Sequence, residues 1–264
     1  MGDMMRSIWA YRFFILSSIR SDLKIRFLRS KLGTMWMIIH PLAQVLIFAL
    51  ILSEVLSAKL PGIDNKYAYA LYLMAGTLGW TLFAETITKS VSLFIDNANL
   101  MKKMAFPRIC LPIILAGTML VQNALLLLAI FLVFAALGHF PDAHALWLPV
   151  LILITLLLSL SLGTLLGVFN VFVRDIGQVV PVVLQALFWF TPIVYSLEIL
   201  PASTQAWFRL NPLHPLIASY QNVLVYGRDP YWSDLGWLAL ASVIMGVAAL
   251  VVFRKANAEM VDML

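Results

Sequence analysis

Long apolar runs recur along most of the chain and constrain its fold more than any other feature. Runs of eighteen or more mostly apolar residues are typical of membrane-crossing helices, because about twenty residues at 1.5 Å each span the hydrocarbon layer. We predict six such helices, with ends defined to about two to four residues. They lie at approximately 34–56, 69–95, 113–137, 146–172, 177–197 and 235–253.

The composition agrees with a membrane protein. Of the 264 residues, 62% are hydrophobic and 12% are charged, whereas a soluble domain is nearer half apolar and a quarter charged. One globule of this length could not bury so much apolar surface, so the surplus is expected to face lipid. We therefore predict an all-α polytopic membrane protein with six transmembrane helices.

Basic residues alternate between the connections. Thirteen of the eighteen Lys and Arg residues fall in the N-terminal segment, the second and fourth connections and the C-terminal tail. Membrane proteins concentrate basic residues on the cytoplasmic side. We therefore place these segments, with both termini, in the cytoplasm. The same placement explains the net charge of +5 without a nucleic-acid partner.

An amphipathic helix is predicted over residues 5–31, before the first span. Its apolar stripe consists of Trp9, Phe13, Leu16, Ile19, Leu23 and Phe27. Arg12 and Arg20 interrupt the stripe, but long Arg side chains keep their charge at the headgroups while their stems lie on lipid. We predict that this helix lies on the cytoplasmic leaflet. A cytoplasmic helix packed on protein is the alternative.

A second apolar segment, residues 216–226, is also too short to cross, since about eleven helical residues extend only about 16 Å. Asn211-Pro212 precedes it and Gly227 ends it. We predict a re-entrant helix in the outer leaflet, whose irregular flanks need cover by protein or a wet cavity. The chain is thus divided into an interface helix at 5–31, five spans at 34–197, an external re-entrant region at 198–233 and a sixth span at 234–254.

The two halves of the chain show no internal repeat. Transporters that alternate access usually contain two related halves, so a symmetric homodimer would supply the second half here. Gly163 and Gly167 form a G-x-x-x-G step, which lets another helix approach closely. This step would serve either the dimer or packing within one subunit.

Catalytic motifs are missing from the sequence. It contains no H-E-x-x-H, no G-x-S-x-G and no Walker loop G-x-x-x-x-G-K-[ST]. His139 and His144 share a short connection with Asp142, but we do not favour a metal site there. We expect no catalytic residue, metal or cofactor in this chain. Any ATP-driven work would need a separate ATPase subunit.

Two charges fall inside the second predicted span. Glu85 and Lys89 lie four residues apart, in the favourable order for a helical ion pair. A single charge at the membrane centre costs about 2.5–3.5 kcal/mol on insertion scales. We interpret the two as a structural pair or a pair in a wet interior, and as a pair they need not mark a proton path.

Aromatic residues cluster at Phe188-Trp189-Phe190, near the middle of the fifth predicted span. Most membrane Trp and Tyr residues lie in belts at the interfaces, and a cluster at mid-span fits a belt poorly. Aromatic rings with apolar faces and a polar edge suit sugar rings. A glycan conduit is therefore one function that this cluster fits.

Four stretches together resemble a known family. They are RSDLKIRFLRSKLGTMWMIIHPL at 20–42, LMKKMAFPRICLP at 100–112, VRDIGQVVPVVLQALFWFTPIVYS at 173–196 and NPLHPLIASYQNVLVYG at 211–227. In this order and spacing they resemble the permease subunits of type-two ABC exporters. Among these, they are similar to the branch that exports O-antigen, capsule or teichoic acid chains. The resemblance covers nearly the whole chain.

The resemblance implies a homodimer bound to two copies of an ABC ATPase subunit, which would hold ATP and Mg²⁺. The stretch 97–108 resembles the cytoplasmic coupling segment that docks on the ATPase, and the interface helix would transmit its motion. The implied coupling residues are Arg20, Asp22, Arg26, Lys102, Lys103, Phe106 and Arg108. For the basic ones, the positive-inside rule alone is the alternative.

The resemblance also implies a conduit at the dimer interface, lined partly by aromatic residues of the first and fifth spans. The residues expected to line it are Trp36, Phe188, Trp189 and Tyr195. We predict a permease that moves lipid-linked polysaccharide from cytoplasm to periplasm across a bacterial inner membrane. An exporter of small drugs or lipids is one alternative, and the stretch at 20–42 argues against it. A membrane-embedded glycan-lipid transferase is the other, disfavoured by the missing polar residues.

Overall fold

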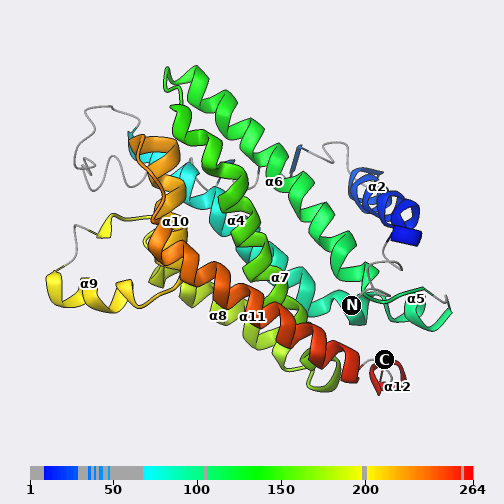
Figure 1. Ribbon diagram of the computed structural model, residues 1–264. Coiled ribbons are helices and arrows are strands. Elements are labelled where there is room, and N and C mark those ends of the chain that lie inside the picture. Colours follow the sequence, from blue (N-terminus) through cyan, green and yellow to red (C-terminus); the bar gives the residue numbers. More distant parts are fainter. Residues whose placement is uncertain are drawn as a thin grey trace.

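The computed structural model describes residues 9–28, 68–103, 106–197, 201–256 and 259–263, with positions 35, 36, 39, 42, 43 and 47. Within these residues all regular structure is helical (Figure 1). The longer helices are α2 (Arg12–Leu28), α4 (Ala68–Asp96), α6 (Cys110–Ala136), α7 (Leu148–Phe172), α8 (Ile176–Phe190) and α11 (Trp232–Ala256). The shorter ones are α5 (Ala98–Lys103), η1 (Ala143–Trp147), α9 (Ala202–Arg209), α10 (Leu213–Gln221), η3 (Asn222–Tyr226) and α12 (Glu259–Met263).

Three of the described helices are long and apolar enough to cross a membrane: α6, η1 continued by α7, and α11. Helix α4 has 29 residues, about 43 Å, but is less apolar because it carries Glu85, Lys89 and several Tyr, Thr and Gly residues. These four confirm the predicted helices at 113–137, 146–172, 235–253 and 69–95. The predicted span at 34–56 lies mostly outside the described residues.

The fifth predicted span differs from the structure. A continuous helix over 177–197 is wrong, because α8 has 15 residues and ends at Phe190. At 1.5 Å per residue it extends only about 22 Å. Pro192 follows after Thr191, and its ring and missing N–H disfavour a further helical turn. Residues 191–197 continue as turns, and Thr191, Ile193 and Val194 are buried.

The core forms where α4 packs along α7, with α11 on another side of α7 and α6 against α4. Glycines permit the α4–α7 approach. A methyl group added at Gly167 would lie 2.3 Å from the carbonyl oxygen of Ser90, and one at Gly163 would lie 2.6 Å from the Ser90 Cβ. The G-x-x-x-G step therefore serves packing within one subunit.

A short buried helix precedes the last long one, as predicted. Helix α10 and the π-helical η3 together cover 213–226, and both pack against α4. Leu216, Tyr220 and Val223 are fully buried within this segment. Gly227 ends it with φ of 59°, a left-handed conformation that glycine adopts without strain. The irregular flank after it is partly exposed, because Arg228 and Asp229 are exposed.

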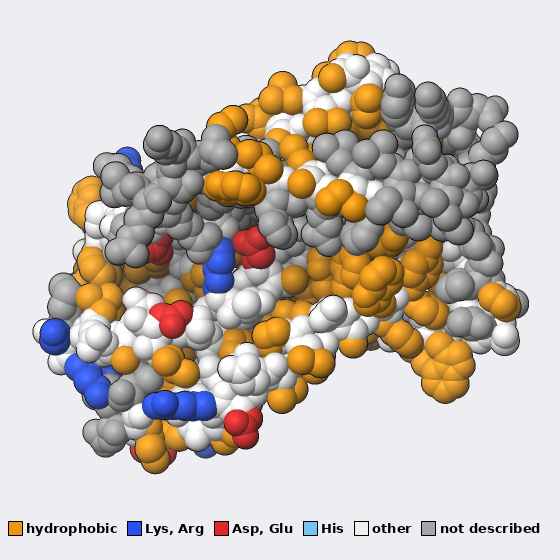
Figure 2. Space-filling view, turned by 180° about the vertical axis from the view of Figure 1, so that it is seen from behind, with side chains coloured by type: hydrophobic (Ala, Val, Ile, Leu, Met, Phe, Trp, Pro, Cys, Tyr) orange, Lys and Arg blue, Asp and Glu red, His pale blue; other side chains and the backbone are white. Residues whose placement is uncertain are grey.

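The connections sort to two ends of the bundle. Helices α2, α5 and α12 and the turn between α7 and α8 lie at one end, whereas α9, α10 and η3 lie toward the other (Figure 1). Figure 2 shows Lys and Arg side chains gathered at the first end. The exposed basic residues at this end are Arg12 and Arg20 of α2, Lys102 and Lys103 of α5, Arg174 in the turn, and Arg254 and Lys255 in the last turn of α11. We call this the basic end. Segments that the charge pattern groups together are therefore neighbours in space.

Candidate functional site

At the basic end, the interface helix packs against the start of α6. Ile15 of α2 is buried with Cys110 and Ile114 of α6. Ile19 also belongs to this contact, because a methyl group at Gly117 of α6 would lie 2.4 Å from its Cδ1 atom. Ile19 is therefore not part of an exposed stripe, which corrects that detail of the sequence interpretation.

The opposite side of α2 exposes apolar rings. Trp9 is 71% exposed, Phe13 69% and Leu16 52%. The guanidinium of Arg12 lies over both rings, 5.1 Å from the centroid of Trp9 and 4.5 Å from that of Phe13. Helix α2 thus has one face on protein and another that suits a lipid surface. The two alternatives, a helix on the membrane surface and a helix packed on protein, thus each fit a different side of α2.

The predicted coupling residues fall on two segments that the structure joins. Lys102 and Lys103 are exposed at the end of α5, while Met101 beside them is buried. The ring of Phe106, which follows α5, lies 5.4 Å from the ring of Phe14 in α2. This contact links the 97–108 segment to the interface helix.

The remaining predicted coupling residues lie on α2 and directly before α6. Arg20 and Asp22 are exposed on α2, and Arg108 is partly buried before α6. The side chain of Arg26 lies outside the described residues. At the same end, Met260 of α12 is buried in the cluster that contains Met101. The C-terminal helix therefore stabilises α5, which the sequence interpretation missed.

Three of the four predicted conduit residues come together where α8 ends. Phe188 packs on Trp80 of α4, with ring centroids 5.5 Å apart, and on its neighbour Trp189 at the same distance. Trp189 is 54% exposed. The hydroxyl of Tyr195 donates a hydrogen bond to the carbonyl oxygen of Trp189. Trp36, the fourth residue, is 52% exposed within the sparsely described first segment.

One face of α8 is apolar and exposed along its length. Among the described helices, α8 contacts α4 and α7, and the side away from both carries this face. Its large exposed residues are Val179, Val182, Val183, Trp189 and Phe190. We call this the α8 face. Gln178 and Gln185 of the same helix are also exposed, so the face is mostly apolar. Such a face on a short helix needs lipid or another protein surface to cover it.

The turn after α8 is held by polar groups from distant segments. Carbonyl groups freed where the helix ends need partners, because a buried polar group without a hydrogen bond is costly. The hydroxyl of Tyr72 in α4 lies 3.2 Å from the carbonyl oxygens of Pro192 and Tyr195. The amide of Asn211 donates to the Phe190 carbonyl at 3.1 Å and to the Thr191 hydroxyl at 2.8 Å. The turn is therefore stabilised by tertiary hydrogen bonds from α4 and from Asn211.

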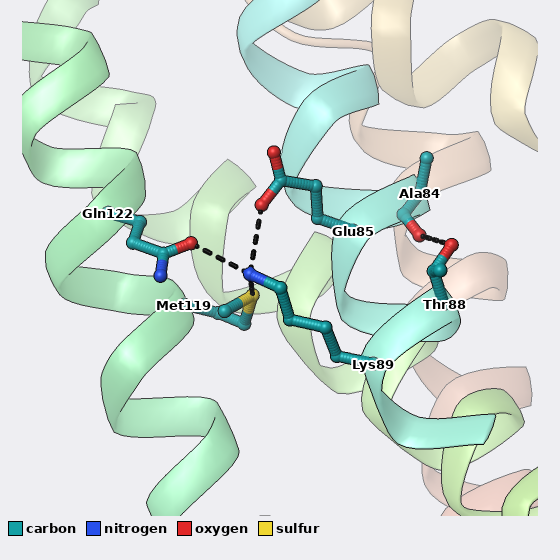
Figure 3. Close-up of polar contacts among 6 residues, drawn as sticks. All are labelled: Ala84, Glu85, Thr88, Lys89, Met119 and Gln122. Atoms are coloured by element: carbon teal, nitrogen blue, oxygen red, sulfur yellow. Dashed lines mark hydrogen bonds and ion pairs between the residues drawn. The ribbon is translucent and has the colours of Figure 1, made fainter. Parts of the chain in front are cut away.

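The charged pair of α4 reaches across to α6 (Figure 3). Lys89 Nζ lies 3.2 Å from the Glu85 carboxylate and donates to Gln122 Oε1 at 3.0 Å. The sulfur of Met119 lies 3.7 Å from the same nitrogen. The predicted ion pair is confirmed, and the ammonium also bridges two helices. This arrangement satisfies the charge locally and fits the structural interpretation.

The histidines near Asp142 take separate partners. The Nε2 atom of His139 lies 2.9 Å from the Leu224 carbonyl oxygen. His144 Nε2 lies 3.8 Å from the Asp229 carboxylate. Asp142 itself approaches Gly227, where an added methyl group would meet its carboxylate at 2.5 Å. These groups fasten η1 to the η3 segment instead of converging on one point.

An open pocket of about 1010 Å³ lies at the end opposite to the basic end. Residues from the 192–197 turn, α9, α10, η3 and the start of α11 form its walls. Its aromatic and charged members include Tyr226, Tyr231, Trp237, Arg209, Arg228, His214 and Asp234. We call it the outer pocket. Sequence reasoning did not find it. Its only signal was the density of aromatic residues and arginines in the external connection.

Comparisons with known proteins agree with this architecture. A family model described as ABC-2 type transporter matches residues 15–225. The O-antigen export system permease protein RfbA of Myxococcus xanthus is 28% identical over 261 residues, which cover 98% of each chain. An RfbA protein of Klebsiella pneumoniae is 27% identical over 259 residues, 96% of each chain. The polysialic acid transport protein KpsM of Escherichia coli is 22% identical over 242 residues, 90% of this chain and 92% of that protein.

The match of the family model covers most of the chain, from the interface helix through η3. It includes α5, the α4–α7 core and the aromatic end of α8. This chain is a member of the ABC-2 type transporter family.

Proposed function

We propose that this chain is the membrane-spanning permease subunit of an ATP-driven exporter of lipid-linked polysaccharide. The observation that carries the proposal is similarity along nearly the whole chain to relatives named for O-antigen export. It would move its substrate from the cytoplasm to the periplasm across a bacterial inner membrane. Both termini and the basic end would face the cytoplasm, in accord with the positive-inside rule.

The α8 face supports a homodimer around the conduit. Two copies joined through this face would cover its apolar residues by two-fold symmetry. Trp189 and Phe190 would then lie near the junction between subunits, with Phe188 behind them on Trp80. Aromatic faces along the path would let successive sugar rings slide past without fixed hydrogen bonds. A polymer of repeating sugars needs such weak, repeated contacts to keep moving.

The basic end supports docking of two ATPase subunits, which would bind ATP and Mg²⁺. Exposed Lys102 and Lys103 present charge, and buried Met101 anchors their helix to the core. The Phe106–Phe14 contact provides a mechanical connection from this segment to α2. Closure of the ATPase pair on ATP would displace the 97–108 segment and α2 together, and so open the conduit.

A deletion experiment tests the proposal. Cells that lack the chain should retain lipid-linked polysaccharide in the cytoplasm and lose it from the surface, and the purified chain should bring down an ATPase subunit. Intact surface polysaccharide in the deletion strain, with no ATPase recovered, would refute the proposal. Replacement of Phe188 and Trp189 by alanine should slow export while assembly with the ATPase is retained. Loss of assembly would identify them as packing residues instead.

A further inference from the structure

The outer pocket has the size and openness of a ligand site. Its volume of about 1010 Å³ lies at the upper end of the range for small-molecule sites, about 300–1,000 Å³. The 192–197 turn, α9, α10, η3 and the start of α11 converge on it, together with Tyr72 of α4, so its shape depends on the whole outer end of the fold. Tyr72 and Asn211, which hold the turn after α8, also form part of its wall. The wall is therefore supported from behind by hydrogen bonds.

Aromatic rings are available on the open side of this pocket. Trp237 is 72% exposed and Tyr231 is 46% exposed, both near the start of α11. Tyr226 is more buried, and the Arg228 guanidinium lies 5.6 Å from its ring centroid. Sugar rings have apolar C–H faces and a rim of hydroxyl groups. Exposed aromatic faces surrounded by polar side chains complement both parts.

The charges around the pocket favour an acidic ligand. Arg209 and Arg228 line it and are exposed, and Asp234 is the one carboxylate among its described lining residues. Burial and the nearby Arg209 lower the pKa of His214 below its usual 6.5, although Asp234 acts in the opposite direction. The imidazole is therefore neutral at pH 7, and the pocket has a net positive charge. Guanidinium groups bind carboxylates and phosphates in paired hydrogen bonds.

Long aliphatic side chains are scarce in the lining. Leu197 and Leu238 are the only Leu, Ile or Val residues among the described lining residues. An acyl chain would need a longer apolar groove. Most other positions carry hydrogen-bonding groups, such as Gln205, Asn222 and Ser196. This composition suits a hydroxyl-rich ligand better than a lipid.

We propose that the outer pocket binds a segment of an acidic polysaccharide, with its rings on Trp237 and Tyr231 and its acidic group at Arg209 and Arg228. The inference rests on the proposed function, because the exported chain would be the ligand. None of the four predicted conduit aromatics lines this pocket. Each subunit would therefore hold the emerging chain at a second place and hinder its return.

Binding to the intact complex tests this inference. The permease with its ATPase is placed in phosphatidylcholine nanodiscs and titrated with the bacterium's own surface polysaccharide, freed from lipid by mild acid. We expect saturable binding, and Trp237→Ala or Arg209→Ala should each raise the Kd at least about tenfold. Trp207→Ala is the matched aromatic control, since Trp207 is 67% exposed on α9 and does not line the pocket. This control should keep the wild-type Kd.

Several results would overturn the inference. These are equal Kd values for all variants, equal binding of the polysaccharide after its acidic groups are removed, and an absence of binding. Displacement of the polysaccharide by phosphatidylglycerol nanodiscs would instead identify a lipid-headgroup site. Export in the deletion strain is scored separately. If deletion abolishes export but the pocket variants bind normally, the outer pocket inference fails and the proposed function stands.

Discussion

At the scale of single residues, side chains far apart in the sequence hold the irregular backbone after α8. Asn211 alone makes three contacts there. Its amide nitrogen donates to the Phe190 carbonyl and the Thr191 hydroxyl, and its carbonyl oxygen accepts from the Leu213 backbone N–H at 3.0 Å. The residue is 5% exposed. One side chain thus joins the end of α8 to the start of α10.

Replacement of Asn211 by leucine should destabilise the protein. The Phe190 carbonyl and the Leu213 N–H would lose a partner in a buried site, which costs about 1–3 kcal/mol per unsatisfied group. We expect a lower thermal unfolding midpoint for the purified protein in detergent. Asn99→Leu, at an exposed position on α5, should leave the midpoint unchanged. Equal midpoints for both variants would show that Asn211 does not hold the turn.

The charged pair makes a second prediction at this scale. Lys89→Leu leaves the Glu85 carboxylate and Gln122 without their shared ammonium, so it should lower the unfolding midpoint. The double variant Glu85→Gln/Lys89→Leu should be more stable than Lys89→Leu alone, because no uncompensated charge remains. We expect an interaction energy of about 0.5–2 kcal/mol from the cycle. Additive effects would contradict a structural pair, and so would loss of export in Glu85→Gln alone.

At the scale of elements, apolar periodicity located helices well but did not locate their breaks. The helices at 68–96, 110–136 and 232–256 agree with the sequence prediction because long apolar runs have few alternatives in lipid. The run 177–197 also reads as one span. Hydropathy does not distinguish a buried turn from a buried helix, and this turn depends on Tyr72 and Asn211, which contact it only in the folded chain.

The candidate site was predictable to a similar extent. Charge alternation grouped the segments of the basic end correctly, since like segments must lie on the same side. Pairwise contacts, such as Phe106 with Phe14 or Met101 with Met260, could not be read from the sequence. The outer pocket was also hidden, because its walls come from segments that are brought together only by the fold.

The contact of α7 with α4 makes a prediction at this scale. In Gly167→Ala the new methyl group would meet the Ser90 carbonyl oxygen at 2.3 Å, and backbone does not yield easily. The helices must separate, at a cost of about 1–3 kcal/mol. Gly236→Ala is the matched control, because nothing lies within 4 Å of an added methyl group there. We expect a lower unfolding midpoint for the first variant and an unchanged or higher one for the second. The reverse order would contradict the packing.

At the scale of the whole molecule, the α8 face and the basic end are two exposed surfaces among the described residues of a single subunit. They lie on different parts of the bundle and differ in chemistry, one apolar and the other charged. A homodimer would cover the first, and an ATPase subunit would cover the second. The positions of both surfaces follow from the α4–α7 core, which fixes where α8 and α5 leave the bundle.

Cysteine cross-linking tests the dimer. Cys110 is the only cysteine in the sequence and is fully buried, so an added thiol can be followed alone. Val182 is 66% exposed on the α8 face. Val182→Cys should therefore form a cross-linked dimer in membranes when a short bifunctional thiol reagent is added. Leu132→Cys, 65% exposed on α6, should not form a cross-linked dimer. Cross-linking of Leu132→Cys alone would place the interface elsewhere.

The central claim is that the basic end faces the cytosol, where a separate ATPase subunit can bind it. Lys102→Cys places a thiol on exposed α5, while buried Cys110 serves as the unreactive background. We predict that a membrane-impermeant maleimide labels Lys102→Cys in inverted inner-membrane vesicles and leaves it unlabelled in right-side-out spheroplasts. Labelling in spheroplasts, with protection in inverted vesicles, would contradict the account.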